Sequence, residues 1–178
     1  MQCKIRSYNY VRAEIFGKKP TWMNRAISLR SKPQVHTEIQ YSERFNSISF
    51  SSTMQDGDNG CRFKEIKYSH ELQRWDTVIA PMTDEEEDLS FEKAKAMIAA
   101  GIKYDLVGQL AHLFKFKLWK TSRKGKMHCT RAVGEALYVG RPDFFDFLKN
   151  YKLDLTEIKP DQLDMMARYY FERLKEST

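Results

Sequence analysis

"VHTEIQY", residues 35–41, alternates apolar and polar side chains with the period of two that is typical of a half-buried β-strand. Successive side chains of a strand point to opposite faces, so Ile39 and Tyr41 share one face, and His36 and Glu38 share the other. We therefore expect the first face to pack into the core and the second face to carry a site.

The same period of two continues on both sides of this strand, through the first half of the chain. The other segments that it marks as strands are "CKIRSYNYVR" (3–12), "SISF" (47–50) and "CRFKEI" (61–66), and the short apolar run "DTVIAPM" (76–82) also predicts a strand. Residues 54–60, "MQDGDNG", contain Asp-Gly and Asn-Gly, which tolerate positive φ and predict a hairpin loop. We expect four or five strands that are mainly antiparallel.

The second half of the chain changes to a period near 3.6, which predicts amphipathic helices. Ser90 is the predicted N-cap of the first helix, with a run of acidic residues just upstream of it. The apolar stripes of the predicted helices are Phe91, Ala94, Met97 and Ile98; Leu106, Leu110, Leu113 and Phe114; Ala132, Val133, Ala136 and Leu137; Phe144, Phe145, Phe147 and Leu148; and Leu163, Met166, Ala167 and Tyr170. Strands followed by helices indicate an α+β fold, in which an antiparallel sheet or half-barrel packs against helices.

Length and composition limit the classes of protein to which the chain can belong. With 178 residues, of which 42% are hydrophobic, the chain can bury one continuous core, so we expect a single domain over residues 1–178. Three cysteines without a CxxC pair argue against a disulfide framework and against a four-thiolate zinc site. No run of eighteen apolar residues occurs, and charges interrupt the N-terminal segment. We therefore expect a cytoplasmic protein, in the host cytoplasm if it is viral.

Two distant parts of the sequence together suggest thiol chemistry. Cys129 stands at the start of a predicted helix and behind a basic segment, and both features favour the thiolate form. His36 can take the thiol proton, and a carboxylate at the spacing of Glu38 can fix the tautomer of its imidazole. His128 is a rival base, although adjacent side chains at a helix start diverge, which favours His36. Considered singly, Cys129 fits a small buried hydrophobe and the His36–Glu38 pair fits a surface contact.

The order of these parts resembles the circularly permuted, NlpC-like branch of the papain-like cysteine peptidases and amidases, in which the histidine strand precedes the cysteine helix. The segments that carry the resemblance are "RAISLRSKPQVHTEI" (25–39), "YDLVG" (104–108), "HCTRAV" (128–133) and "IKPDQLDMM" (158–166). The resemblance implies a permuted papain-like fold with Cys129 as the nucleophile, His36 as the general base and Glu38 as the group that orients the imidazole. A basic segment, "KFKLWKTSRKGK" (115–126), departs from the family pattern.

The resemblance also suggests which residues contact the substrate. Tyr104 and Asp105 match the tyrosine-aspartate element of the family, and we expect them to shape the pocket or support the nucleophile helix, with helix packing as the alternative. Trp119, in the basic segment, is a third expected substrate contact. The implied activity is a thiol hydrolase that cleaves an amide, isopeptide or ester bond through an acyl-enzyme. Its expected substrate carries a peptide-like or lipid-like acyl group, and the chemistry needs no cofactor.

Three other interpretations stay open. The first is non-enzymatic: the basic segment 115–126, with its interleaved aromatic residues, binds an anionic polymer or a membrane surface, without an obligate nucleic-acid partner. The second is a zinc site built from His36, Glu38, His128 and Cys129, whose donor types suit zinc. The third is a catalytically inactive member of the same fold that retains the triad residues.

Overall fold

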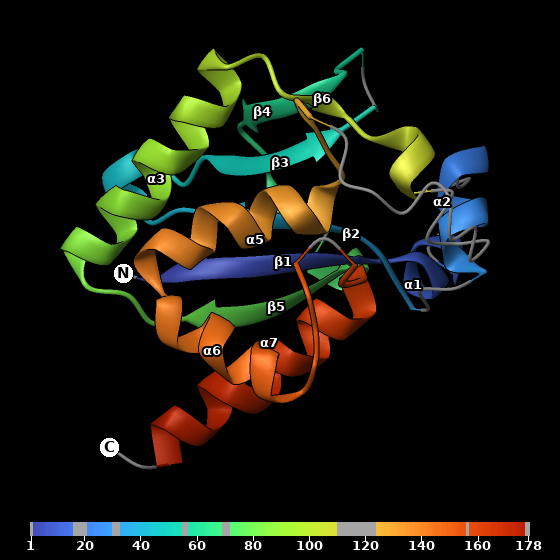
Figure 1. Ribbon diagram of the computed structural model, residues 1–178. Coiled ribbons are helices and arrows are strands. Elements are labelled where there is room, and N and C mark those ends of the chain that lie inside the picture. Colours follow the sequence, from blue (N-terminus) through green and yellow to red (C-terminus); the bar gives the residue numbers. More distant parts are fainter. Residues whose placement is uncertain are drawn as a thin grey trace.

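A five-stranded antiparallel sheet, with the strand order β4-β3-β2-β1-β5, forms the centre of the computed structural model (Figure 1). The structure describes residues 2–15, 21–29, 33–54, 57–68, 72–109, 124–155 and 157–176. The strands are β1 (Cys3–Asn9), β2 (Gln34–Gln40), β3 (Ser49–Thr53), β4 (Gly60–Lys64) and β5 (Trp75–Ala80). The predicted strand at residues 35–41 is therefore the middle strand of the sheet.

In the described part of the chain, the four longer helices follow the sheet strands, whereas two short helices, at residues 10–15 and 22–28, lie between the first and second strands; the architecture confirms the predicted α+β fold. The helices are α1 (Tyr10–Ile15), α2 (Trp22–Ser28), α3 (Asp84–Ala99), α5 (Cys129–Gly140), α6 (Pro142–Asn150) and α7 (Pro160–Glu176). Figure 1 shows α5 across the middle of the sheet, where it contacts β2 and β3, while α7 contacts β1, β2 and β5. Among the described residues, no helix has both the length and the apolar character needed to cross a bilayer.

The main core lies between the sheet and α5, α6 and α7. Ile5 of β1, Ile39 of β2 and Phe50 of β3 are fully buried against these helices. On the helix side, the predicted stripe of Ala132, Val133, Ala136 and Leu137 is also fully buried. Removing each large apolar side chain from water stabilises the fold by about 1.5–3 kcal/mol. The small residues of this stripe allow the N-terminal half of α5 to lie close to the strands.

The predicted start of α3 is wrong. The helix begins at Asp84, and Thr83 is its N-cap in a capping box, in which the Thr83 hydroxyl accepts the Glu86 N–H and Glu86 accepts the Thr83 N–H. The acidic residues upstream of Ser90 form the first turns of the helix, where its positive end stabilises them. Ser90 is instead buried within the helix, and its carbonyl oxygen accepts a hydrogen bond from the Tyr41 hydroxyl.

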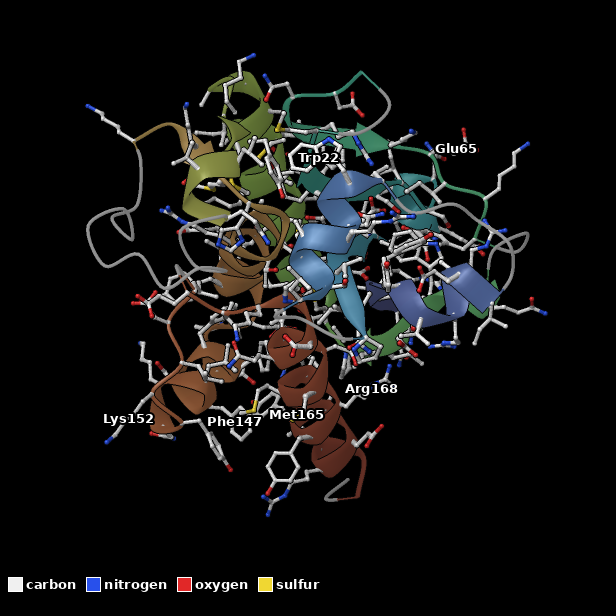
Figure 2. All side chains as sticks on the ribbon, turned by 90° about the vertical axis from the view of Figure 1, so that its right-hand side faces the viewer. Trp22, Glu65, Phe147, Lys152, Met165 and Arg168 are labelled. Carbon is white, nitrogen blue, oxygen red and sulfur yellow. The ribbon has the colours of Figure 1, made fainter. Side chains whose placement is uncertain are left out.

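The predicted strand over residues 3–12 is too long, because the chain turns into α1 at Tyr10. The side chain of Asn9 accepts the N–H of Arg12 and so caps this short helix. Figure 2 looks onto the end of the molecule formed by α1 and α2, with Trp22 of α2 labelled. Neither helix was predicted, because six or seven residues are too few to display a helical period.

The predicted hairpin loop at residues 54–60 is confirmed, since β3 and β4 pair on either side of it. Gly60 ends the loop with φ of 137°, and a Cβ atom at this position would lie 2.2 Å from the carbonyl oxygen of Ile102. Only glycine therefore fits this turn and this close approach of the two backbones.

A short parallel pair of strands connects the sheet to the start of α5. β6 (Lys103–Tyr104) pairs with β7 (Lys126–Met127). The carbonyl oxygen of Met127 accepts hydrogen bonds from the Asp105 N–H and, at 2.8 Å, from the Ser52 hydroxyl of β3. These bonds fix the backbone just before Cys129 against the sheet.

Candidate active site

Folding brings the thiol of Cys129 to the imidazole of His36. The first turn of α5 lies over β2 and β3, and the Cys129 side chain is fully buried there. The side chains of His36 and Cys129 lie close enough that each shifts the pKa of the other. Because Glu38 Oε1 lies 3.0 Å from His36 Nε2, Nδ1 is the ring nitrogen left to face the sulfur. The contact expected between the later helix and the earlier strand is therefore formed.

Glu38 occupies the place expected of a carboxylate that orients the imidazole. Its side chain is buried, with 1% of the residue exposed, and it lies on the same face of β2 as His36. An acceptor at Nε2 holds the ring in one orientation and stabilises the imidazolium form. The structure thus brings together the Cys129 thiol, the His36 imidazole and the Glu38 carboxylate, with a hydrogen bond between His36 and Glu38.

The charges of these groups stabilise one another. Burial raises the pKa of the Cys129 thiol, but hydrogen bonds from His128 and His36 more than offset this effect and hold the pKa well below its ordinary value. Burial lowers the pKa of His36, but the hydrogen bonds and negative charges of Cys129 and Glu38 raise it to about 9. At neutral pH the favoured state is therefore a thiolate beside an imidazolium, which is the reactive form of a cysteine nucleophile.

His128 also reaches the sulfur, so the expectation that its side chain diverges from Cys129 is wrong. His128 is the N-cap of α5, and its Nδ1 accepts the backbone N–H of Arg131 at 3.3 Å. A neutral imidazole that accepts at Nδ1 carries its proton on Nε2. His128 lies near enough to the thiol to lower its pKa, whereas His36 also contacts Glu38 and is therefore the better placed of the two histidines to act as a base.

Replacing His128 with asparagine should separate its two roles. Asparagine is a good N-cap, so we expect the helix to remain stable, while the loss of the imidazole donor raises the pKa of the Cys129 thiol. The rate of iodoacetamide alkylation at pH 5 should then fall by about threefold to tenfold, as expected for one lost hydrogen bond to a charged group. Alkylation that keeps the wild-type pH dependence in His128→Asn would contradict this role.

The start of α5 also supplies backbone donors. The first N–H groups of a helix have no partner within the helix, and they point toward its positive end. The side chain of His128 takes the N–H of Arg131, which leaves the N–H groups of Cys129 and Thr130 as the candidate donors of this turn. Such donors can hold an oxyanion that forms on a carbonyl attacked by the thiolate.

The structure buries Tyr104 in the apolar cluster that contains Tyr68 and Trp75, and it gives Asp105 a local role. Burial raises the pKa of Tyr104, and the nearby negative charges of Cys129 and Asp105 raise it further. Asp105 Oδ1 accepts the N–H of Gly108 at 2.9 Å and so caps the turn that follows it. A Cβ atom on Gly108 would lie 2.3 Å from Asp105 Oδ2, which explains the glycine of the "YDLVG" segment. Asp105 therefore contributes to a helix start, whereas Tyr104 packs in the buried cluster with Tyr68 and Trp75, the residues that contact Glu38 and His36.

The third expected substrate contact, Trp119, lies outside the described residues, together with most of the basic segment 115–126. Lys124 and Lys126 are described, and both are exposed. Binding of this segment to an anionic polymer or membrane surface stays a prediction.

Three residues of the site were not predicted from the sequence. Arg62 of β4 and Tyr68 both hydrogen-bond to Glu38, and the Trp75 ring lies edge-on to the His36 ring with a centroid distance of 6.3 Å. A charged residue between Cys61 and Phe63 in a strand is a weak signal for Arg62. Tyr68 and Trp75 lack such a signal, because long-range pairing of strands and loops brings them to His36 and Glu38.

Two of the side chains proposed as zinc ligands, His36 and Glu38, already hydrogen-bond to other groups. His36 Nε2 faces Glu38, and Glu38 itself accepts from Arg62 and Tyr68. Within the part of the chain that the structure describes, no group of three or more His, Cys, Asp or Glu side chains is arranged to hold a metal ion. The geometry therefore favours proton transfer among these groups over metal coordination.

Comparison with known proteins adds no relative: no protein-family model, curated protein or solved structure matches this chain. The inference about its chemistry therefore depends on the geometry of Cys129, His36 and Glu38.

Proposed function

We propose that this protein is a cysteine-dependent hydrolase that cleaves an amide, isopeptide or ester bond through an acyl-enzyme. Cys129 is the nucleophile, His36 transfers protons and Glu38 orients the His36 ring. The observation that supports this proposal is that folding brings Cys129 beside His36, whose Nε2 in turn lies 3.0 Å from Glu38 Oε1. A lone buried cysteine would not need a histidine and an ionised carboxylate beside it.

The proposed reaction has two steps. The Cys129 thiolate attacks the substrate carbonyl carbon, and the N–H groups of Cys129 and Thr130 stabilise the oxyanion. Collapse of this intermediate breaks the bond to the leaving group, which takes the proton from the His36 imidazolium. Neutral His36 then removes a proton from water, the hydroxide attacks the acyl-enzyme, and the carbon–sulfur bond breaks to restore the thiolate.

The proposed substrate carries a peptide-like or lipid-like acyl group. This part of the proposal depends on the resemblance to the permuted NlpC-like branch of the papain-like enzymes, in which a histidine strand precedes the cysteine helix. The chain has this order, with His36 on β2 and Cys129 at the start of α5. We therefore also propose that the chain is a permuted papain-like domain.

A panel of acyl compounds tests the proposal directly. Esters, thioesters and peptide amides with chromogenic leaving groups are incubated with the protein, and acylated peptides are identified by mass spectrometry. We expect the acyl group on Cys129 and release of the leaving group in excess of one equivalent. Acylation confined to other residues of a folded protein, or no reaction with any compound of the panel, would reject the hydrolase.

The pH dependence of kcat/KM should be bell-shaped. As the pH rises through the depressed pKa of Cys129, the thiolate forms and the rate increases. As the pH rises further through about 9, His36 loses the proton that the leaving group needs, and the rate decreases. The profile is measured from pH 4 to pH 10.5 with an amide substrate. A rate that continues to increase up to the highest pH would show that His36 does not act as the acid.

A further inference from the structure

Three donors from the described part of the chain share the Glu38 carboxylate. His36 Nε2 at 3.0 Å and Arg62 Nη2 at 3.1 Å both contact Oε1, whereas the Tyr68 hydroxyl contacts Oε2 at 2.6 Å. A buried carboxylate keeps its charge only where donors or cations replace the water that it has lost. Since Arg62 and His36 both use Oε1, Tyr68 is the group that fixes the other oxygen and thereby the plane of the carboxylate.

Tyr68 is itself held on several sides. Its hydroxyl has one proton, which goes to the acceptor-only carboxylate, so the Ser49 hydroxyl at 2.8 Å donates to the Tyr68 oxygen. The Arg6 guanidinium lies 4.4 Å from the centre of the Tyr68 ring, and the Trp75 ring packs edge-on at 5.2 Å. A hydroxyl that accepts one hydrogen bond donates the next one more strongly. Hydrogen bonds thus lead from Ser49 of β3 through Tyr68 to Glu38.

We propose that Tyr68 is a positioning residue of the active site, whose hydroxyl orients the Glu38 carboxylate so that Oε1 faces the His36 ring. Its effect on catalysis depends on the proposed hydrolase function. Its effect on Glu38 does not depend on that function and can be measured without a substrate.

Loss of the Tyr68 hydroxyl has a defined electrostatic consequence. Burial raises the pKa of the Glu38 carboxyl group, but His36, Arg62 and Tyr68 together hold the pKa below its usual value. Without the Tyr68 donor, Oε2 faces a buried environment unpaired, so Glu38 takes up a proton at a higher pH. A protonated Glu38 no longer stabilises the imidazolium of His36, and the thiolate of Cys129 loses its partner in turn.

The variant Tyr68→Phe tests the proposal through the titration of Glu38. Protein labelled with ¹³C at the glutamate carboxyl carbons is titrated by NMR, and the Glu38 signal is assigned by its absence in Glu38→Gln. We expect the midpoint in Tyr68→Phe to move upward by about tenfold or more in proton concentration, the effect of one hydrogen bond to a charged group. An unchanged midpoint would overturn the proposal.

Tyr170→Phe is the matched control. It also removes a tyrosine hydroxyl that donates to a carboxylate, in this case Asp143, on the α6 and α7 side of the molecule. We expect the Glu38 midpoint of this variant to equal that of the wild type. If the Glu38 midpoint shifted as far in Tyr170→Phe as in Tyr68→Phe, the shift would reflect a general change of the fold, and the proposal would be overturned.

A second substitution covers the case in which Tyr68→Phe does not fold. Incorporation of 3-fluorotyrosine at position 68 keeps the ring and makes the phenol a stronger donor, so the Glu38 midpoint should move to lower pH. An unchanged midpoint would also overturn the proposal.

In an active enzyme, the acidic limb of kcat/KM should follow the Glu38 midpoint in each variant. If the midpoint moves but the wild type hydrolyses no acyl compound, the role of Tyr68 stands and the hydrolase proposal fails.

Discussion

Replacing Cys129 with alanine is expected to reduce hydrolysis of the best acyl substrate by at least about 10⁴-fold, because the thiolate is the group that forms the covalent bond. Alanine leaves His36, Glu38 and the helix start in place, so the backbone donors can still bind the carbonyl oxygen. Among the described residues, Thr130 lies next to the sulfur position, and its hydroxyl is a far weaker nucleophile than a thiolate. The measurement is kcat/KM of wild type and variant, with circular dichroism as the test of folding.

The other two cysteines provide the control for this substitution. Burial raises the pKa of Cys61 to about 11, and it raises the pKa of Cys3 well above its ordinary value, so both remain neutral thiols. We expect iodoacetamide at pH 6 to label wild type and Cys61→Ala equally, at Cys129, and to leave Cys129→Ala unlabelled. Undiminished labelling of Cys129→Ala would show that the reactive thiol lies elsewhere.

Replacing His36 with glutamine should cost at least about 10³-fold in kcat/KM, because two contributions disappear together. The leaving group loses its proton donor, and the Cys129 thiolate loses a cationic partner, so its pKa rises. The acidic limb of the alkylation profile should therefore move toward the pH at which an ordinary thiol ionises. Both quantities are measured on the same preparation, kcat/KM with an ester and alkylation by mass spectrometry.

Gln40→Ala is a suitable control for His36→Gln. Gln40 lies on the same strand, four residues along, and its side chain contacts Arg6 and the backbone of Ser47. We expect this variant to retain activity within about threefold, as for substitutions outside the mechanism. If Gln40→Ala and His36→Gln lost activity equally, the loss would reflect damage to β2, and the proton-transfer role of His36 would be wrong.

The parts of the site that could be predicted are those encoded by local patterns. Alternation in residues 35–41 placed His36 and Glu38 on one face of a strand, and the apolar period after Cys129 placed it at a helix start; the structure has both. Their meeting was inferred from chemistry and from the resemblance, because no local pattern states which strand a helix covers.

The parts that could not be predicted depend on pairing across the sheet. Arg62 reaches Glu38 from β4, two strands away from β2, and Tyr68 reaches it from the segment beyond β4. The alternation of side chains along one strand does not show how that strand is aligned with its neighbours. This register decides which side chains meet across the sheet. The start of α3 was predicted wrongly for a different reason. The acidic residues before Ser90 were placed outside the helix, although the first turn of a helix favours acidic side chains. The capping box of Thr83 and Glu86 shows that the helix includes them.

β2 pairs with β1 along residues 34–40 and with β3 at Ile39 and Gln40, and it carries two of the three proposed catalytic residues. Interior strands of a sheet exchange their amide protons only in the rarest openings, while ends and edges fray continually. The His36–Glu38 pair should therefore persist as long as the whole fold does. On heating, inactivation should coincide with cooperative melting of the protein and should not precede it.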